Sequence, residues 1–216
     1  MLKTNKPYKV HDDVNDVKIE QKFLPLGLNN RSGEHQNPEF IVIHEVSLGI
    51  GRSPEEYNME HYAKKILQDG INGSKIGYHY LVGSNAIFQF IPDDEITCHT
   101  GTDYFNSNSI GIERVICSST YYPNALHNQA KLAATLMLKH NIPINNVISH
   151  KSCRIISGNP KKECPGRLIA GQYGGFKAFY NEIKKCIHER DLFFEILYDN
   201  IVLTDESQIL KKEIEV

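Results

Sequence analysis

The chain alternates short apolar runs with longer stretches in which apolar residues recur at helical spacing. The short runs are rich in β-branched and aromatic residues, which predicts strands, and a Gly-Ser-Asn turn between two of them predicts a hairpin. The predicted strands are residues 40–46, 77–82, 86–91 and 110–116, with a further short apolar pair at 147–148.

Amphipathic stretches between the apolar runs predict helices. Ser53, Pro54 and Glu56 fit the N-cap, the first position and the third position of a capping box, so a helix is expected from there to about Gln68. Further helices are predicted over 124–140 and 176–188. Strands that alternate with helices, together with one hairpin, predict an α/β fold: a single domain with a central mixed β-sheet flanked by helices on both faces.

The 216 residues divide into three parts. Residues 1–38 are polar and irregular and form an N-terminal lead-in, and residues 39–190 hold the regular elements of the domain. Residues 191–216 form a C-terminal extension of unknown role, apolar in its first half and charged at its end. A packed helix, a packed strand and a homodimer contact are all compatible with that extension.

Composition narrows the classes of function. The net charge of −2 and the lack of a basic stripe argue against a nucleic-acid partner, and no apolar stretch reaches the length of a membrane span. The five cysteines form no Cys-x-x-Cys pair, so neither a disulfide framework nor a four-thiolate zinc site is indicated. Residues 1–15 hold no apolar segment of signal-peptide length, so we expect synthesis and folding in a reducing cytoplasm.

His44 lies near the C-terminal end of the first predicted strand, where an imidazole either packs in the core or binds a metal. Its available partners are His150, which follows a second short apolar piece, and Cys164 in a Cys-Pro-Gly turn. Two imidazoles and one thiolate would suit an open zinc site that keeps a position for water. Spacing alone makes this triplet only suggestive.

Five ordered motifs carry a more specific signal. They are Ile-Val-Ile-His at 41–44, Gly-Tyr-His-Tyr at 77–80, Gly-Ile-Glu at 111–113, Ile-Ser-His at 148–150 and Lys-Glu-Cys-Pro-Gly at 162–166. Over about residues 20–185 the chain resembles the zinc-dependent N-acetylmuramoyl-L-alanine amidases of phage lysozymes, bacterial autolysins and peptidoglycan recognition proteins. Pro-Leu-Gly-Leu-Asn-Asn-Arg at 25–31 is similar to the Gram-positive autolysin and phage branch.

The resemblance implies a role for each matching residue. Zn²⁺ would be the cofactor, peptidoglycan the partner, and the bond between N-acetylmuramic acid and L-alanine the one cleaved. Bound zinc would activate water, with a general base and a cation beside it. The implied metal ligands are His44, His150 and Cys164, the implied general base is Glu113, the implied oxyanion-stabilising cation is Lys162, and the implied metal-neighbouring or substrate-binding residue is His79.

The chain departs from the family pattern at two places. His99 corresponds to the histidine of a Trp-His-Ala-Gly segment, but Cys98 replaces the tryptophan, so no role is assigned to His99. The interval 151–163 is longer than is usual in this branch and contains Cys153, a competing thiol ligand. We favour Cys164, because the Lys-x-Cys-Pro-Gly context surrounds it.

Two other functions stay open at the level of sequence. One is a module that binds peptidoglycan without cutting it, and the other is a thiol hydrolase that uses Cys164 with a histidine. For the amidase we expect synthesis in the cytoplasm without a signal peptide and action on the cell wall after release or holin-type export, as a phage endolysin or a bacterial autolysin.

Overall fold

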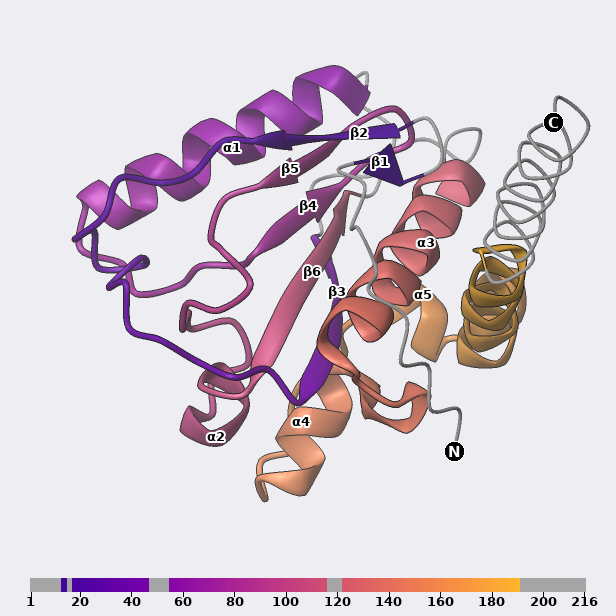
Figure 1. The fold of residues 1–216 in the computed structure, drawn as a ribbon. Coiled ribbons are helices and arrows are strands. Elements are labelled where there is room, and N and C mark those ends of the chain that lie inside the picture. The colour runs from indigo at the N-terminus through magenta and orange to yellow at the C-terminus, as the bar shows by residue number, and fades with distance from the viewer. Residues whose placement is uncertain (1–12, 15–16, 47–54, 116–121, 191–216) are drawn as a thin grey trace, which may run out of the picture.

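A mixed sheet of seven strands forms the centre of the computed structural model, which describes residues 13–14, 17–46, 55–115 and 122–190 (Figure 1). The strand order is β1-β2-β5-β4-β6-β3-β7. Strands β1 and β2 pair antiparallel, as do β4 and β5, and the other neighbours are parallel. The strands are β1 Asp13–Val14, β2 Val17–Gln21, β3 Phe40–Val46, β4 Tyr80–Val82, β5 Ile87–Gln89, β6 Ser109–Val115 and β7 Val147–Ser149.

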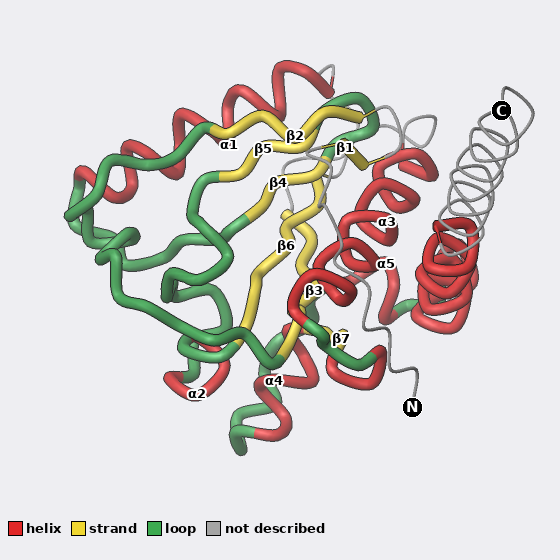
Figure 2. Tube along the Cα trace, viewed as in Figure 1, coloured by secondary structure: helices red, strands yellow, loops and turns green. Residues whose placement is uncertain are grey.

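Helices cover both faces of this sheet, which confirms the predicted α/β class (Figure 2). The α-helices are α1 Glu55–Ile71, α2 Asp103–Asn106, α3 Tyr122–His140, α4 His150–Ile156, α5 Gly166–Ile169 and a helix over residues 175–190. Two short 3-10 helices are η1 Ile144–Asn146 and η2 Gln172–Gly174. Within the described residues, no helix combines the length and the apolar character that crossing a membrane requires.

Successive side chains of each strand point to opposite faces of the sheet, so a separate hydrophobic core forms on each face. On one face, Ile41 and Ile43 of β3 belong to a cluster with Leu132 of α3 and Phe179 of the last helix. On the other face, α1 packs on β4 and β5, and α2 and α4 pack near Val42. His44 is on the same side of β3 as Val42, so it faces away from α3. The side chain of His44 therefore projects from the face of β3 that also carries Val42.

Helix α3 also braces β3 and β6 from the opposite face. Gln129 donates from Nε2 to the carbonyl oxygens of His44 and Ile112, at 3.1 and 3.0 Å. Arg114 donates to Gln129 Oε1 at 2.7 Å and forms a buried ion pair with Glu45 at 2.6 Å. These polar contacts hold the two central strands together at the level of His44.

The structure corrects two sequence predictions. The lead-in is not irregular throughout, because Val17–Gln21 forms β2 and pairs with β5. The long interval 151–163, expected as an enlarged loop, is helical as far as Ile156, where α4 ends. Ser149 caps this helix by accepting a hydrogen bond from the backbone N–H of Ser152 at 2.9 Å. Several predictions lie outside the described residues: the helix cap at Ser53 and Pro54, the last residue of the strand predicted over 110–116, and the extension 191–216 with its possible homodimer contact.

Candidate metal centre

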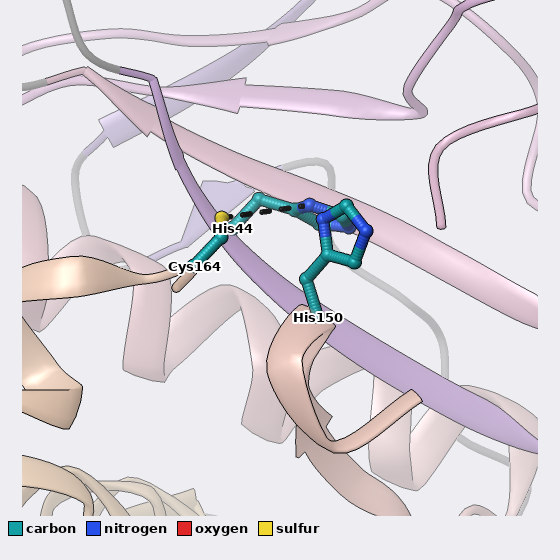
Figure 3. Close-up of side chains that lie close together, drawn as sticks. All are labelled: His44, His150 and Cys164. Carbon is teal, nitrogen blue, oxygen red and sulfur yellow. Dashed lines mark hydrogen bonds between the residues drawn. The ribbon is translucent and has the colours of Figure 1, made fainter. Parts of the chain in front are cut away.

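His44, His150 and Cys164 converge although they come from three separate segments. Their ligand atoms all lie within 4.8 Å of one another, and the side chains are buried. The Cys164 sulfur lies 4.0 Å from His44 Nδ1, and the rings of His44 and His150 lie 4.7 Å apart between centroids (Figure 3). The predicted triplet is thus brought together in space.

The sheet register explains this convergence. Strand β7 pairs in parallel with β3, with Ile43 opposite Ser149, so the next residue, His150, is at the level of His44. Cys164 lies two residues before the start of α5, and its carbonyl oxygen accepts a hydrogen bond from the backbone N–H of Lys151 at 2.9 Å. The parallel strands β3 and β7 therefore position His44 and His150, and the backbone hydrogen bond from Lys151 positions Cys164 beside them.

The three side chains offer ligand atoms of the kind that bind a metal ion. Ligands bonded to tetrahedral zinc at about 2.0–2.3 Å lie about 3.3–3.6 Å apart, so only a small contraction separates these donors from a metal-bound arrangement. Burial, followed by the charges of His99 and His150, lowers the pKa of His44 well below its ordinary value. Burial also lowers the pKa of His150 to about 4. Both imidazoles are therefore neutral near pH 7, as metal ligation requires.

Glu113 faces the same space from the neighbouring strand. It is the register partner of His44, and its Oε1 lies 3.6 Å from His44 Nδ1. Its other oxygen, Oε2, is buried and has no hydrogen-bond partner within the described part of the chain. Burial raises the pKa of Glu113 to about 8, and the positive charge of Lys162 acts against that rise. A buried acceptor without a partner beside the three donors fits a site where a metal and water bind.

Lys162 lies close enough for its charge to act on the cluster. It lowers the pKa of His44, His150 and Glu113, although burial is the larger influence on each. The side chain is exposed, and within the described residues it forms no hydrogen bond or ion pair. The neighbouring Glu163 pairs instead with Lys151 at 2.6 Å. Lys162 is therefore a cation available to a bound substrate.

The structure argues against the predicted substrate contact of His79. Its side chain is fully buried, and Nδ1 accepts a hydrogen bond from the backbone N–H of Gly111 at 3.0 Å. Its Nε2 lies 2.9 Å from the carbonyl oxygen of Glu95 and 3.1 Å from Gln36 Nε2. Both ring nitrogens are engaged in holding β6 and the segment after β5, so His79 is a structural residue beside the site.

Other thiols and clusters fit the site less well. Cys153, the competing ligand, is fully buried against Val42 and Phe105 and lies outside the ligand triplet. A second group of three potential ligands consists of His127, Glu182 and Cys186, but His127 Nδ1 already pairs with Glu182 at 2.6 Å. A cavity of about 510 Å³ lies between β2, β5 and α3, on the other face of the sheet, and is not part of the cluster.

The segment 98–102, to which the sequence assigns no role, contacts both histidines of the triplet. His99 Nδ1 lies 3.0 Å from His44 Nε2, and the carbonyl oxygen of Thr100 lies 2.9 Å from His150 Nε2. The only sequence signal was the position of His99 in the family pattern. No local pattern points to the backbone of Thr100.

Comparisons with known proteins identify a family and two similar amidases. The family model described as N-acetylmuramoyl-L-alanine amidase, Amidase_2, matches residues 34–167. The N-acetylmuramoyl-L-alanine amidase XlyA of Bacillus subtilis (strain 168) is 32% identical over 165 residues, which is 75% of this chain and 50% of XlyA. The amidase CwlH of the same organism is 30% identical over 156 residues, which is 71% of this chain and 57% of CwlH. This chain thus spans about half the length of these relatives.

A solved structure extends the agreement to three dimensions. The catalytic domain of XlyA superimposes with a TM-score of 0.62 at 29% identity, covering 77% of this chain and 99% of that domain. The family match includes all three residues of the triplet, together with Glu113 and Lys162. The chain belongs to the Amidase_2 family of N-acetylmuramoyl-L-alanine amidases.

Proposed function

We propose that this protein is a zinc-dependent peptidoglycan hydrolase that cleaves the amide bond between N-acetylmuramic acid and the L-alanine of the stem peptide. The observation that carries the proposal is the buried triplet His44, His150 and Cys164 with the carboxylate of Glu113 beside it. Family membership and the amidase names of the two relatives support the substrate class.

His44, His150 and Cys164 would hold the zinc ion. When bound, zinc polarises a carbonyl oxygen and lowers the pKa of water. Neutral imidazoles are ready to ligate, whereas the Cys164 thiol must lose its proton on binding, because burial raises its pKa to about 12 in the metal-free chain.

Glu113 acts as the general base and then as the general acid. Burial raises the pKa of Glu113 to about 8 in the metal-free chain, and the positive charge of a bound metal would lower it again, so that the ionised carboxylate can act as the base. Its Oε2, which has no partner in the described part of the chain, then takes a proton from the attacking water as the new C–O bond forms. The same carboxyl returns this proton to the amine nitrogen as the C–N bond breaks. The products are the lactyl carboxylate of the glycan and a stem peptide with a free alanine amine.

Lys162 stabilises the charge that develops on the carbonyl oxygen. Its ammonium group is exposed and forms no ion pair within the described residues, so a substrate oxygen can approach it. A preorganised positive charge at that oxygen lowers the energy of the tetrahedral transition state more than that of the planar amide.

The experiment follows the release of stem peptides from purified cell wall. We expect new N-terminal alanine to appear without new reducing sugar ends, to stop after chelation, and to return when zinc is added. Activity that persists after complete removal of the metal would contradict zinc dependence.

Two further outcomes would favour the alternatives. Wall binding without new N-terminal alanine would indicate a binding module. Loss of activity after thiol alkylation, with zinc still bound, would indicate a thiol hydrolase. The raised pKa of Cys164, which burial causes, disfavours that second alternative, because a nucleophilic cysteine works as a thiolate.

A further inference from the structure

One loop contacts both histidines of the triplet through atoms that do not face the metal position. We call residues 98–102 the orienting loop. His99 reaches His44 through its ring, and Thr100 reaches His150 through its carbonyl oxygen. The contacted atom is Nε2 in both ligands, at 3.0 and 2.9 Å.

In the hydrogen bond between His150 and Thr100, His150 is the donor. A carbonyl oxygen only accepts, so Nε2 of His150 carries the proton and donates it to Thr100. A neutral imidazole has one N–H, which leaves the lone pair on Nδ1. Thr100 therefore selects the tautomer in which Nδ1 of His150 is free to bind a metal.

In the hydrogen bond between His44 and His99, the donor is identified by following a chain of hydrogen bonds from Ser109. The hydroxyl of Ser109 donates to the carbonyl oxygen of Phe105, so its oxygen accepts from His99 Nε2 at 3.2 Å. His99 thus carries its proton on Nε2, and its Nδ1 accepts from His44 Nε2. The lone pair of His44 is consequently on Nδ1, the atom that lies 4.0 Å from the Cys164 sulfur.

The orienting loop is itself held from two sides. Oδ1 of Asn106, a buried residue, accepts hydrogen bonds from the backbone N–H groups of His99 and Thr100, at 3.0 and 2.9 Å. It also accepts one from the Thr100 hydroxyl at 2.9 Å. From the other side, Arg154 of α4 donates to the carbonyl oxygen of Gly101 at 2.6 Å. The loop is therefore fixed independently of the ligands it orients.

Gly111 provides the space for the His99 ring. A Cβ atom at Gly111 would lie 2.6 Å from His99 Nδ1, closer than real Cβ contacts allow. The need for glycine at the first position of the Gly-Ile-Glu motif is thus explained by the room that His99 requires, independently of Glu113. Only a residue without a side chain lets the ring of His99 lie against β6 and meet His44.

We propose that His99 and Thr100, held by Asn106, are positioning residues that fix both histidine ligands as Nε2–H tautomers with Nδ1 directed to the metal. The proposal rests on the zinc site of the proposed function. Partners of this kind raise metal affinity about 10- to 100-fold. They act through the ligands and touch neither the metal nor the substrate.

A matched pair of variants tests the proposal. His99→Asn keeps an acceptor oxygen at the δ position, whereas His99→Leu has nearly the same shape and no acceptor. We expect His99→Leu to weaken zinc binding about 10- to 100-fold, measured by competition with a chromophoric chelator, and His99→Asn to recover most of that loss. The melting temperature of each metal-free variant is measured alongside, because a purely structural defect would lower it in both variants equally.

Nitrogen NMR of the metal-free protein gives a second readout that does not need zinc. We expect the Nε2–H tautomer at His44 in the wild type and a mixture of tautomers in His99→Leu. Wild-type zinc affinity in His99→Leu, or an Nδ1–H tautomer at His44 in the wild type, would overturn the proposal. If the wild type binds no zinc yet shows the Nε2–H tautomer, the proposed function fails and the orientation of His44 stands.

Discussion

His44 and Glu113 project side by side from paired positions of the parallel strands β3 and β6, with His44 Nδ1 3.6 Å from Glu113 Oε1. The proposed metal ligand and the proposed proton acceptor thus lie on two neighbouring inner strands of the sheet. His150 and Cys164 complete the ligand set from the neighbouring strand end and loop. Under the proposed function this pairing separates two roles, because the histidine would hold the metal and the carboxylate would accept the proton.

Replacing Glu113 by glutamine tests the proton-transfer role. The amide keeps the size of the side chain but cannot accept a proton, so we expect kcat for stem-peptide release to fall about 10²- to 10⁴-fold. Zinc content should stay at the wild-type level. The control is Glu163→Gln, which changes an exposed carboxylate in the neighbouring loop. Equal activity in the two variants would remove Glu113 from the mechanism.

Lys162 and Lys161 form a matched pair, because they are adjacent and both exposed. Of these two lysines, Lys162 is the one whose charge acts on the pKa values of His44, His150 and Glu113. We expect Lys162→Met to lower kcat about 10²- to 10³-fold, with little change in wall binding, because the charge matters mainly in the transition state. Lys161→Met should resemble the wild type. Similar losses in both variants would indicate general attraction to the wall.

The metal-free protein should lose stability as the pH falls from about 7 to 5. Burial lowers the pKa of four imidazoles, so the unfolded chain binds more protons in this range than the folded one. At pH values below the ordinary pKa of histidine, each of these imidazoles lowers the free energy of unfolding by up to about 1.4 kcal/mol per pH unit. Glu113 opposes this trend, because its pKa of about 8 lets the folded chain keep one proton that the carboxyl of the unfolded chain has mostly lost in this pH range.

Urea unfolding of the metal-free protein at several pH values measures this slope. His150→Asn removes one of the four titrating groups and should make the slope shallower. A free energy of unfolding that stays constant or rises between pH 7 and pH 5 would contradict the prediction.

The buried ion pair between Arg114 and Glu45 offers a test of the fold. The side chain of Arg114 is 0% exposed and that of Glu45 is 2% exposed. Arg114→Met leaves a carboxylate buried without this partner, and we expect it to cost about 3–5 kcal/mol of unfolding free energy. Lys65→Met breaks the exposed Lys65–Asp69 pair and should cost less than about 1 kcal/mol. Denaturant titration of both variants makes the comparison, and equal costs would refute it.

The pattern of apolar and polar residues predicts strands β3 to β6 and helices α1 and α3. The grouping of His44, His150 and Cys164 follows from the family resemblance, because spacing alone makes it only suggestive. The triplet could be predicted because each ligand lies in a short motif whose order along the chain is itself informative. Strand β2 was missed although Val17 and Ile19 alternate with polar residues, because so short a pattern beside a polar terminus is weak. Helix α4 was missed because Ser149 was not recognised as its cap.

The roles of His79 and His99 could not be predicted for a different reason. Both are buried, and their functions depend on contacts with residues far away along the chain, such as Gly111 and His44. Local spacing carries no information on such contacts. The resemblance therefore implies a place near the metal or the substrate for His79, whereas in the structure its ring nitrogens contact the backbone of Gly111 and Glu95, and the sequence assigns no role to His99.

X-ray absorption at the zinc edge tests the central claim most directly. The zinc-loaded protein should show one sulfur at about 2.3 Å and two imidazole nitrogens at about 2.0–2.1 Å, with one zinc per chain. Cys164→Ser should lose the sulfur shell, and His44→Ala should lose one imidazole. A wild-type spectrum without sulfur, or a sulfur shell that survives Cys164→Ser, would contradict the assignment of His44, His150 and Cys164 as the metal site.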